Sequence, residues 1–424
     1  MSDQRAPAVS PWLWVPTLYF AQGLPNGLHE DVAPALFADL GVKNDALTHA
    51  LALAAIPWML KAFWSPVVDS YGTKRRWIWL GQLVGALAFA AFAAAPFADR
   101  PERYGLVCLA LVALGSATHD IAADGFYLFG VRTDGEQAFF SGIRNTTFRL
   151  AKVFSASAVV GLAAYLMKTG RPVAGAWGAA LALFALAGVA LAVWHARVLP
   201  KPPEDRPAGG GTSLATAFVE GWSTFFRIPG IGRALLFILF FRLSEALLSA
   251  LFAPFLKNAR ADGGIGLAPE TFAWMNGLGV VALLSGGLLG GFLVSRFGLR
   301  RMLWPMVAVM HLPNLAFLGL AIAQPEHTPL VVAAVGVEKF GYGFGMTAIM
   351  LYLISLCRGE RRVTHYALCS GFMLLGYRFP AYFAGDIQGA VGYVGFFQIV
   401  LLAIIPGVAA TRLVRDIDPA FGKR

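Results

Sequence analysis

Long apolar stretches separated by short polar segments recur along the whole chain. A helix of about 20 apolar residues crosses the roughly 30 Å hydrocarbon core of a bilayer. Backbone groups in lipid must satisfy their own hydrogen bonds, so each stretch predicts a transmembrane helix. Twelve stretches qualify, and they cover residues 12–28, 46–68, 77–97, 104–130, 138–167, 173–198, 233–257, 271–295, 301–323, 328–357, 363–385 and 391–413. The pattern predicts an all-α membrane protein with twelve transmembrane helices.

The longest polar insert divides the stretches six and six. It reads LPKPPEDRPAGGGTS over residues 199–213, and its Pro and Gly content is typical of linkers. We therefore predict an N-terminal six-helix bundle over 1–198, a cytoplasmic linker over 199–232 and a C-terminal six-helix bundle over 233–424. Within the linker, residues 214–230 predict either an amphipathic helix on the inner membrane face or a slack connector.

The two halves repeat a turn after their second helix. VVDSYGTKRR at 67–76 corresponds to LVSRFGLRR at 293–301, with Gly72 matching Gly298. A glycine permits a tight turn in each copy, and a basic cluster follows it. These turns resemble the loop signature of the major facilitator superfamily, although Ser295 replaces the acid in the second copy. The predicted gating residues are Asp69, Gly72, Arg75, Arg76, Gly298, Arg300 and Arg301.

A second repeat joins the fifth and eleventh stretches. SGIRNTTFR at 141–149 corresponds to SGFMLLGYR at 370–378. Duplicated six-helix halves joined by a long cytoplasmic connection are typical of secondary transporters, whose solute site lies near the membrane midplane. The predicted architecture is therefore the major facilitator fold, with two pseudo-symmetric bundles.

Composition and charge support a membrane protein and predict its orientation. Hydrophobic residues make up 57% of the 424 residues and charged residues 14%, and the formal net charge is +10. With the N-terminus inside, cytoplasmic loops and tails carry 20 Lys and Arg residues and the opposite loops carry 7. This bias predicts that both termini are cytoplasmic, in the inner membrane. It also accounts for the basic charge without a nucleic-acid partner.

A few ionisable residues lie inside the predicted spans. An ionised side chain at the bilayer centre costs about 3 kcal/mol on insertion scales, so such residues face a cavity or a partner. Away from the ends of the spans, the cations are Lys61, Arg144, Arg149, Lys152, Arg242, Lys339 and Arg378, and the acids are Asp120, Asp124, Glu245 and Glu338. Arg144 is close enough to the cytoplasmic end of its stretch to be in water. The excess of cations favours an anionic solute.

Two of these acids lie one helical turn apart in the fourth stretch. Ser116, Asp120, Asp124 and Tyr127 share one face of a helix. We expect a network that joins the two aspartates to Arg149 or to Lys61. Repulsion and poor hydration raise the proton affinity of one aspartate, which is the property that proton coupling requires. The alternative is a pair of buried salt bridges that fix helix register. His119 is either a proton relay or a packing residue.

The second half is less acidic. Glu245 follows Arg242 by three residues, a spacing that allows an intrahelical pair. Glu338 opens the segment EKFGYGFGM, whose glycines at 341, 343 and 345 permit close approach of a helix or a ligand. Arg378 corresponds to Arg149 by the repeat, and the two arginines are predicted to clamp an anionic group between the halves.

No catalytic or metal-binding pattern occurs. Cys108, Cys357 and Cys369 have neither CxxC spacing nor a neighbouring His cluster, so we predict no disulfide and no metal site. The seven histidines are scattered, and no motif joins a nucleophile, a base and an orienting group. We expect no cofactor and no enzymatic activity.

Several motifs together resemble the AmpG-type muropeptide permeases and their relatives, the acetyl-CoA transporters, within the major facilitator superfamily. They are YFAQGLPNGL (19–28), LKAFWSP (60–66), HDIAADG (119–125), FRL (148–150), VEKFGYGFGMTAIMLYLISLC (337–357) and THYALCSGFMLLGYR (364–378). The resemblance implies proton-driven import of anhydro-disaccharide peptides. The chain departs from muropeptide members at His119, where they carry Gln, and in the GFYLFG continuation. This marks a divergent branch whose exact substrate does not carry over.

The predicted function is proton-coupled import of an anionic, muropeptide-like solute by alternating access, in a monomer. The residues expected to carry protons are Asp120, Asp124 and Glu338. Those expected to contact the solute are Lys61, Arg149, Arg378, Gln22, Asn26, Tyr127 and Glu245. The alternatives are import of a siderophore or an oligosaccharide, efflux by an antiporter of the same fold, or a non-transporting assembly factor. The fifth helix lacks the Gly- and Pro-rich motif of drug antiporters, and the chain lacks the large extramembrane modules expected of an assembly factor.

Overall fold

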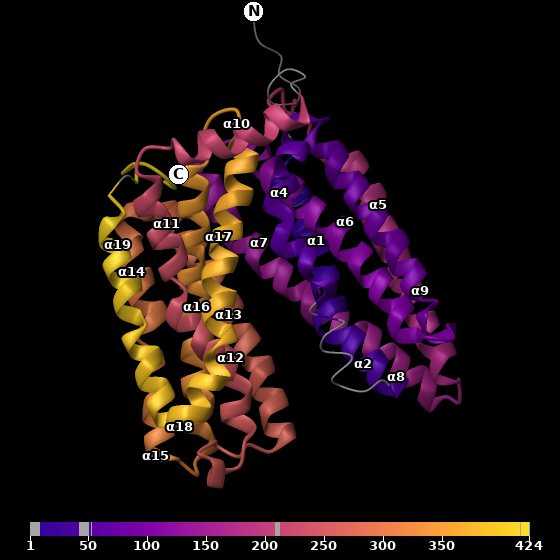
Figure 1. Ribbon diagram of the computed structural model, residues 1–424, viewed down its shortest axis with the longest axis vertical. Coiled ribbons are helices and arrows are strands. Elements are labelled where there is room, and N and C mark those ends of the chain that lie inside the picture. The colour runs from indigo at the N-terminus through magenta and orange to yellow at the C-terminus, as the bar shows by residue number, and fades with distance from the viewer. Residues whose placement is uncertain (1–8, 42–50, 52, 208–212, 416, 424) are drawn as a thin grey trace, which may run out of the picture. The chain divides into compact units, whose positions relative to one another are not determined.

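The computed structural model describes residues 9–41, 51, 53–207, 213–415 and 417–423, and all regular elements in this part of the chain are helices (Figure 1). The helices of the first half are α1 (Val15–Gly27), α2 (Ala33–Asp39), α4 (Ile56–Ser70), α5 (Lys74–Phe92), α6 (Pro101–Gly130), α7 (Asp134–Ser155), α8 (Gly161–Lys168) and α9 (Val173–Val198). After α10 (Leu214–Phe226), those of the second half are α11 (Ile231–Phe240), α12 (Leu243–Lys257), α13 (Pro269–Phe297), α14 (Leu299–His311), α15 (Asn314–Ala323), α16 (Thr328–Leu356), α17 (Arg362–Tyr382), α18 (Ala384–Leu402) and α19 (Ile404–Leu413).

Nine helical runs within the described residues are long and apolar enough to cross a membrane, and they coincide with nine of the twelve predicted stretches. Of the other three stretches, 12–28 lies on α1 and 363–385 lies mainly on α17. The stretch 46–68 includes α4, and its residues 46–50 and 52 lie outside the described part of the chain. The protein is therefore a multi-pass membrane protein.

The chain forms two compact units. The first contains residues 1–132, 144–221 and 359–367, and the second contains 133–143, 222–358 and 368–424. Each unit thus includes a short segment from the opposite half of the sequence. The predicted domains at 1–198, 199–232 and 233–424 remain a prediction.

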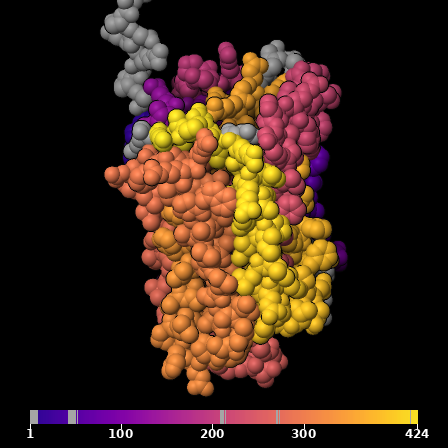
Figure 2. Space-filling model, turned by 90° about the vertical axis from the view of Figure 1, so that its left-hand side faces the viewer, coloured from indigo at the N-terminus to yellow at the C-terminus, as the bar shows by residue number. Residues whose placement is uncertain are grey.

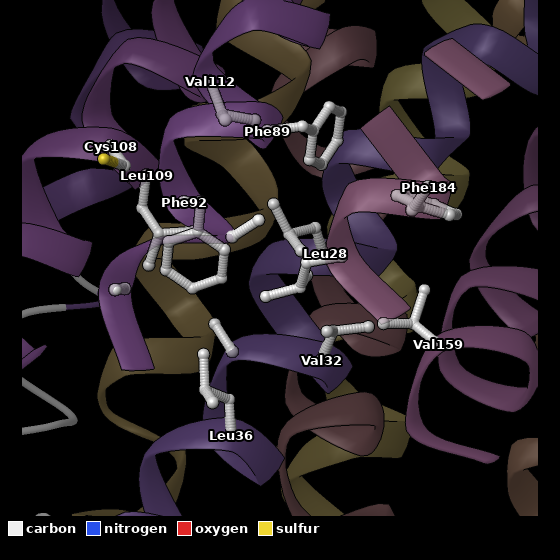
Figure 3. Close-up of a cluster of buried hydrophobic side chains, with 14 of the residues drawn as sticks. Leu28, Val32, Leu36, Phe89, Phe92, Cys108, Leu109, Val112, Val159 and Phe184 are labelled. Atoms are coloured by element: carbon white, nitrogen blue, oxygen red, sulfur yellow. The ribbon is translucent and has the colours of Figure 1, made fainter. Parts of the chain in front are cut away.

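The first unit has an apolar core between α5, α6, α9 and the helices that follow α1. Its members include Leu28, Phe92, Leu109 and Phe184, which point toward one another in Figure 3. α5 lies beside α6 and α9 (Figure 1). α1 continues through a π-helical turn at Leu28–Val32 into α2. Such turns are rare and often occur where a functional side chain must be turned out of helical register.

In the second unit, α16 packs closely on α13 and α14. A Cβ atom added at Gly343 would lie 2.0 Å from the carbonyl oxygen of Leu283, and one at Gly341 would lie 2.2 Å from that of Val309. The glycines of the predicted EKFGYGFGM segment therefore allow neighbouring helices to approach the backbone, one of the two roles expected for them.

We predict that Gly343→Ala destabilises the protein by about 1–3 kcal/mol, because the added methyl group must push α13 away from α16. Gly336→Ala is a matched control in the same helix, since a methyl group added there would have no other atom within 4 Å. The control should be neutral or slightly stabilising. Thermal unfolding of the purified protein in detergent measures both variants. Equal melting temperatures would show that α13 and α16 are not in tight contact.

Candidate functional site

A buried arginine surrounded by tyrosines lies in the first unit. The Arg144 Nη2 atom on α7 lies 2.8 Å from Asp124 Oδ1 on α6, and the Tyr19 hydroxyl donates to the same oxygen at 3.1 Å. The guanidinium carbon lies 4.5 Å from the Tyr19 ring centroid and 4.8 Å from that of Tyr127. Arg144 Nη2 also donates to the Tyr366 hydroxyl at 3.1 Å. We call these five residues the arginine cage.

The cage suits a guanidinium in a poorly hydrated place. Arg144 and Asp124 are each only 7% exposed. A guanidinium is planar, stacks on aromatic faces and offers several donors, so rings and a carboxylate replace its water shell. Stacking of a cation on a ring contributes about 2 kcal/mol when both are desolvated. The cage therefore provides a partner for each of these two side chains inside the unit.

The second aspartate of α6 has a looser cation contact. Lys61 Nζ on α4 lies 3.7 Å from Asp120 Oδ2. Asp120 is 6% exposed, and the buried amide of Gln22 on α1 lies beside it. One turn earlier on α6, Ser116 Oγ accepts a hydrogen bond of 3.2 Å from the Trp58 indole.

These contacts confirm the predicted pairing of Lys61 with an acid of the fourth span, and the acid is Asp120. Of the two cations expected to join this network, Lys61 forms an ion pair, and the partner of Asp124 is Arg144. The expectation that Arg144 lies in water is wrong, because Arg144 is 7% exposed. Because α7 begins at Asp134, Arg144 lies about 15 Å along the helix, deep enough to face α6.

A polar cluster follows α4 at the predicted gate. Asp69 is 1% exposed, and Lys74 Nζ lies 3.0 Å from its Oδ1 atom. The Thr364 hydroxyl donates to Asp69 Oδ2 at 3.0 Å. Beside it, Arg361 donates to Ser70 Oγ at 2.6 Å and to Glu220 Oε2 at 2.6 Å. The segment 359–367 is thereby bound to the turn after α4.

The basic residues of this turn have separate partners. Gly72 adopts φ +68°, as expected for a tight turn. Arg75 donates to the carbonyl of Ala196 in α9, while Arg76 is exposed. The carboxylate of Asp205, in the linker, accepts the backbone N–H of Lys74 at 2.6 Å and that of Arg75 at 3.2 Å. Burial raises the pKa of Asp205, and those two hydrogen bonds oppose the shift. Asp205 thus caps the start of α5.

The corresponding turn of the second unit is simpler. Gly298 adopts φ +83°, so both repeated glycines have a positive φ. Ser295 donates within its own helix to the carbonyl of Phe292 at 2.7 Å. Arg300 and Arg301 are exposed, and the Arg301 guanidinium lies 5.8 Å from the Phe297 ring centroid. The two halves share the turn itself but not the buried acid.

A chain of polar side chains crosses the first unit. Gln82 on α5 lies 2.9 Å from His119 Nε2 on α6 and 2.9 Å from His195 Nδ1 on α9. His195 Nε2 lies 3.0 Å from the Thr17 hydroxyl on α1. Both histidines are buried. Buried polar groups need such partners, so the chain fixes four helices against one another. His119 has the contacts expected of a packing residue.

The second unit has a cage of a different kind. α11 and α12 are separated by a break at Phe241 and Arg242. Arg242 Nη2 lies 2.8 Å from Glu245 Oε2 on the next turn, which confirms the predicted intrahelical pair. The guanidinium carbon lies 4.2 Å from the Tyr377 ring centroid, and Arg242 donates to the Tyr342 hydroxyl at 3.3 Å.

The remaining predicted residues belong to neither cage. Glu338 is 4% exposed and pairs at 2.9 Å with its neighbour Lys339. Arg378 is exposed, with its guanidinium 6.0 Å from the Tyr377 ring centroid, and Arg149 is half-buried. Asn26 donates to the carbonyl of Gln22 at 3.4 Å. Among the described residues, no group of three or more His, Cys, Asp or Glu side chains is placed to hold a metal ion.

Sequence reasoning missed several residues of these clusters. They are Tyr19, Arg144 and Tyr366 in the arginine cage, Lys74, Arg361 and Thr364 at the gate, and Tyr342 and Tyr377 beside Arg242. The sequence feature that could have identified most of these residues is a tyrosine or a cation on a helix that also carries a predicted site residue. That signal does not reveal which helix faces of the bundle meet.

Solved structures of transporters share the fold of this chain. The chain superposes on a crystal structure of the major facilitator superfamily transporter FucP in the outward conformation with a TM-score of 0.73, at 15% identity, over 96% of this chain and 98% of that one. A structure of the proton:xylose symporter XylE gives a TM-score of 0.72 at 13% identity, over 98% and 97%. The chain therefore has the major facilitator fold.

Proteins with similar sequences show which members of this fold the chain resembles. The anhydromuropeptide permease of Escherichia coli K12 is 27% identical over 412 residues, which is 94% of this chain and 78% of that protein. A protein of Rickettsia conorii named AmpG 4 is 26% identical over 377 residues, or 86% of each chain. A model of the BT1 family matches residues 22–170. The resemblance to AmpG-type permeases is thus confirmed, and these relatives are named as permeases and transporters rather than enzymes.

We predict that Arg144→Gln lowers stability by about 3 kcal/mol or more, because it leaves Asp124 charged, buried and without its cation. The double variant with Asp124→Asn should recover most of this loss, since neither charge then remains. Lys168→Gln, at an exposed cation of α8, should have no effect. Thermal unfolding in detergent at neutral pH measures the series. A double variant as unstable as the sum of the single variants would contradict the pairing.

Proposed function

We propose that the protein imports an anionic, muropeptide-like solute across the inner membrane by proton-coupled alternating access, with both termini in the cytoplasm. The observation that supports this most strongly is the pair of adjacent aspartates on α6, each buried against a cation on another helix. Ionisable residues inside a membrane commonly mark proton and ion pathways. Protonation of either carboxylate removes its ion pair and so loosens the contact between two helices.

The two aspartates differ in how firmly they are held. Asp124 has a 2.8 Å contact with Arg144 and a hydrogen bond from Tyr19, all inside the arginine cage. Asp120 has only the 3.7 Å contact with Lys61 as an ion pair. A carboxylate with fewer stabilising partners loses less favourable interaction energy when it is protonated, so it is protonated more easily. We therefore assign the transported proton to Asp120, with Asp124 holding the cage and Glu338 as a further acid of the second unit.

Cations support an anionic solute. Arg378 is exposed and has no ion pair among the described residues, so its guanidinium is available to a carboxylate. Arginine binds carboxylates in a bidentate way. A relative is named as an anhydromuropeptide permease, and peptide-bearing sugars of that kind carry carboxylates. We assign Arg149 and Arg378 to binding of anionic groups. The other proposed solute contacts are Gln22, Asn26, Lys61, Tyr127 and Glu245.

The direct test is uptake into proteoliposomes under an imposed proton gradient. An anhydromuropeptide should accumulate, and a siderophore, a neutral oligosaccharide and acetyl-CoA should not. Accumulation of a different compound from this set would show that the proposed solute is wrong but that the protein is still a proton-coupled carrier. Accumulation that persists when the gradient is collapsed would contradict proton coupling.

Asp120→Asn should abolish gradient-driven accumulation while leaving solute exchange across the membrane intact, because the amide resembles a permanently protonated carboxyl group. Radiolabelled uptake and counterflow, measured on the same vesicles, separate the two activities. Asp386→Asn, at an exposed acid of α18, is the control and should retain both. Normal accumulation by Asp120→Asn would remove this residue from the proton pathway.

Arg378→Ala should weaken solute binding about tenfold or more, since a charge-assisted contact contributes roughly 1.5–3 kcal/mol. The affinity of Arg378→Lys should lie between those of the unchanged protein and Arg378→Ala, because lysine keeps the charge but not the bidentate geometry. Binding to purified protein, measured by calorimetry, isolates affinity from transport rate. Arg171→Ala, at an exposed arginine, controls for overall charge. An unchanged affinity would assign Arg378 a purely structural role.

A further inference from the structure

A groove of about 560 Å³ lies on one face of the second unit. Its walls come from α14 and α15 on one side and from α18 and α19 on the other. Figure 2 shows this face, with the yellow α18–α19 segment beside the orange α14–α15 segment. The volume falls in the range of small-molecule binding pockets, about 300–1,000 Å³.

The lining is apolar over most of its surface. Leu312 is 61% exposed, Leu315 54% and Ile405 62%, so no other part of the described chain covers these walls. Two lining residues are polar, His311 and Arg412. The His311 ring is 3% exposed and its Nδ1 atom lies 3.0 Å from Ser244 Oγ. Arg412 is therefore the charged group that the groove offers to an occupant.

The groove has a polar end and an apolar end. Arg412 and Trp304 lie at one end, near the end of α19 and the start of α14. Leu315 and Leu401 lie at the other. From Trp304 to Leu315 the helical rise amounts to about 16 Å, or roughly half of the 30 Å hydrocarbon core. The groove is thus about as long as one leaflet is deep, and tryptophan is common at the leaflet boundary.

Positive charge gathers at the polar end. Arg412 is exposed and has no ion pair among the residues that the structure describes. Arg300 and Arg301 precede Trp304 by about one turn, and Arg415 follows Arg412 by three positions in the sequence. These four arginines outnumber Asp416 and Asp418, the acids of the same segment. Basic residues at the predicted cytoplasmic surface attract anionic headgroups.

We propose that this groove binds one acyl chain of an anionic glycerophospholipid from the cytoplasmic leaflet, with the headgroup phosphate on Arg412. The apolar walls accept the chain, and the length limits it to one leaflet. The guanidinium at the boundary favours a headgroup of net negative charge over a zwitterionic one, whose ammonium offsets the phosphate charge. This site is separate from the arginine cage and does not depend on which solute is transported.

The test is lipid binding to the purified full-length protein after delipidation. Phosphatidylglycerol and phosphatidylcholine with identical acyl chains are titrated separately, and native mass spectrometry counts the bound lipids. Phosphatidylglycerol should bind more tightly. Arg412→Gln should weaken its binding about fivefold and weaken that of phosphatidylcholine less, because the choline ammonium offsets the phosphate charge. Arg197→Gln, an exposed arginine at the end of α9, should change neither.

Two wall variants test the groove itself. Ala308→Phe on α14 and Ala409→Phe on α19 fill it from opposite sides, and each should weaken binding of both lipids. Leu186→Phe, at a 65% exposed position of α9, is the control. Equal binding of the two lipids with no effect of Arg412→Gln would overturn the headgroup assignment. If neither wall variant changed lipid binding, the groove would not be the lipid site. The proposal would also fail if the protein formed a dimer that either wall variant dissociates, because a second copy would then occupy the groove.

Discussion

An ionised side chain in hydrocarbon needs a partner, and this constraint organises both units. The four acids within the predicted spans each have a cation within 4 Å: Asp120 with Lys61, Asp124 with Arg144, Glu245 with Arg242 and Glu338 with Lys339. Removing one member of such a pair leaves a buried charge uncompensated, at a cost of about 3–5 kcal/mol. The pairs of the first unit join different helices and therefore restrict how those helices can rotate. The tyrosines around Arg144 and Arg242 add to that restriction.

The fold was predictable because its signals are local. The length of an apolar stretch specifies a membrane helix without reference to any other part of the chain. Likewise, Gly72 and Gly298 each adopt positive φ because a tight turn requires it at that residue. The pairing of Lys61 with a helix-four acid needed one further assumption, that the two helices are neighbours. The resemblance to permeases also rests on short motifs that can be read in one dimension.

The site was only partly predictable because charge partners depend on helix rotation. Three consecutive cations illustrate this: Lys74 turns inward to Asp69, Arg75 reaches the carbonyl of Ala196, and Arg76 is exposed. Successive residues of a helix point about 100° apart, so a one-residue error in phase selects a different cation. In the same way, Arg144 on α7 pairs with Asp124, whereas Arg149, five residues further along the same helix, points about 140° away from Arg144.

The two units share a fold but distribute their ion pairs differently, and this difference bears on the proposed mechanism. In the first unit, Asp120 and Asp124 are paired with cations on other helices. In the second, among the described residues, the pairs of Glu245 and Glu338 each lie within one helix or at its first turn. Neutralising an interhelical pair changes how two helices hold together, whereas neutralising an intrahelical pair changes one turn. A proton that must alter helix packing to drive transport therefore acts more effectively in the first unit, which is where the proposed proton site lies.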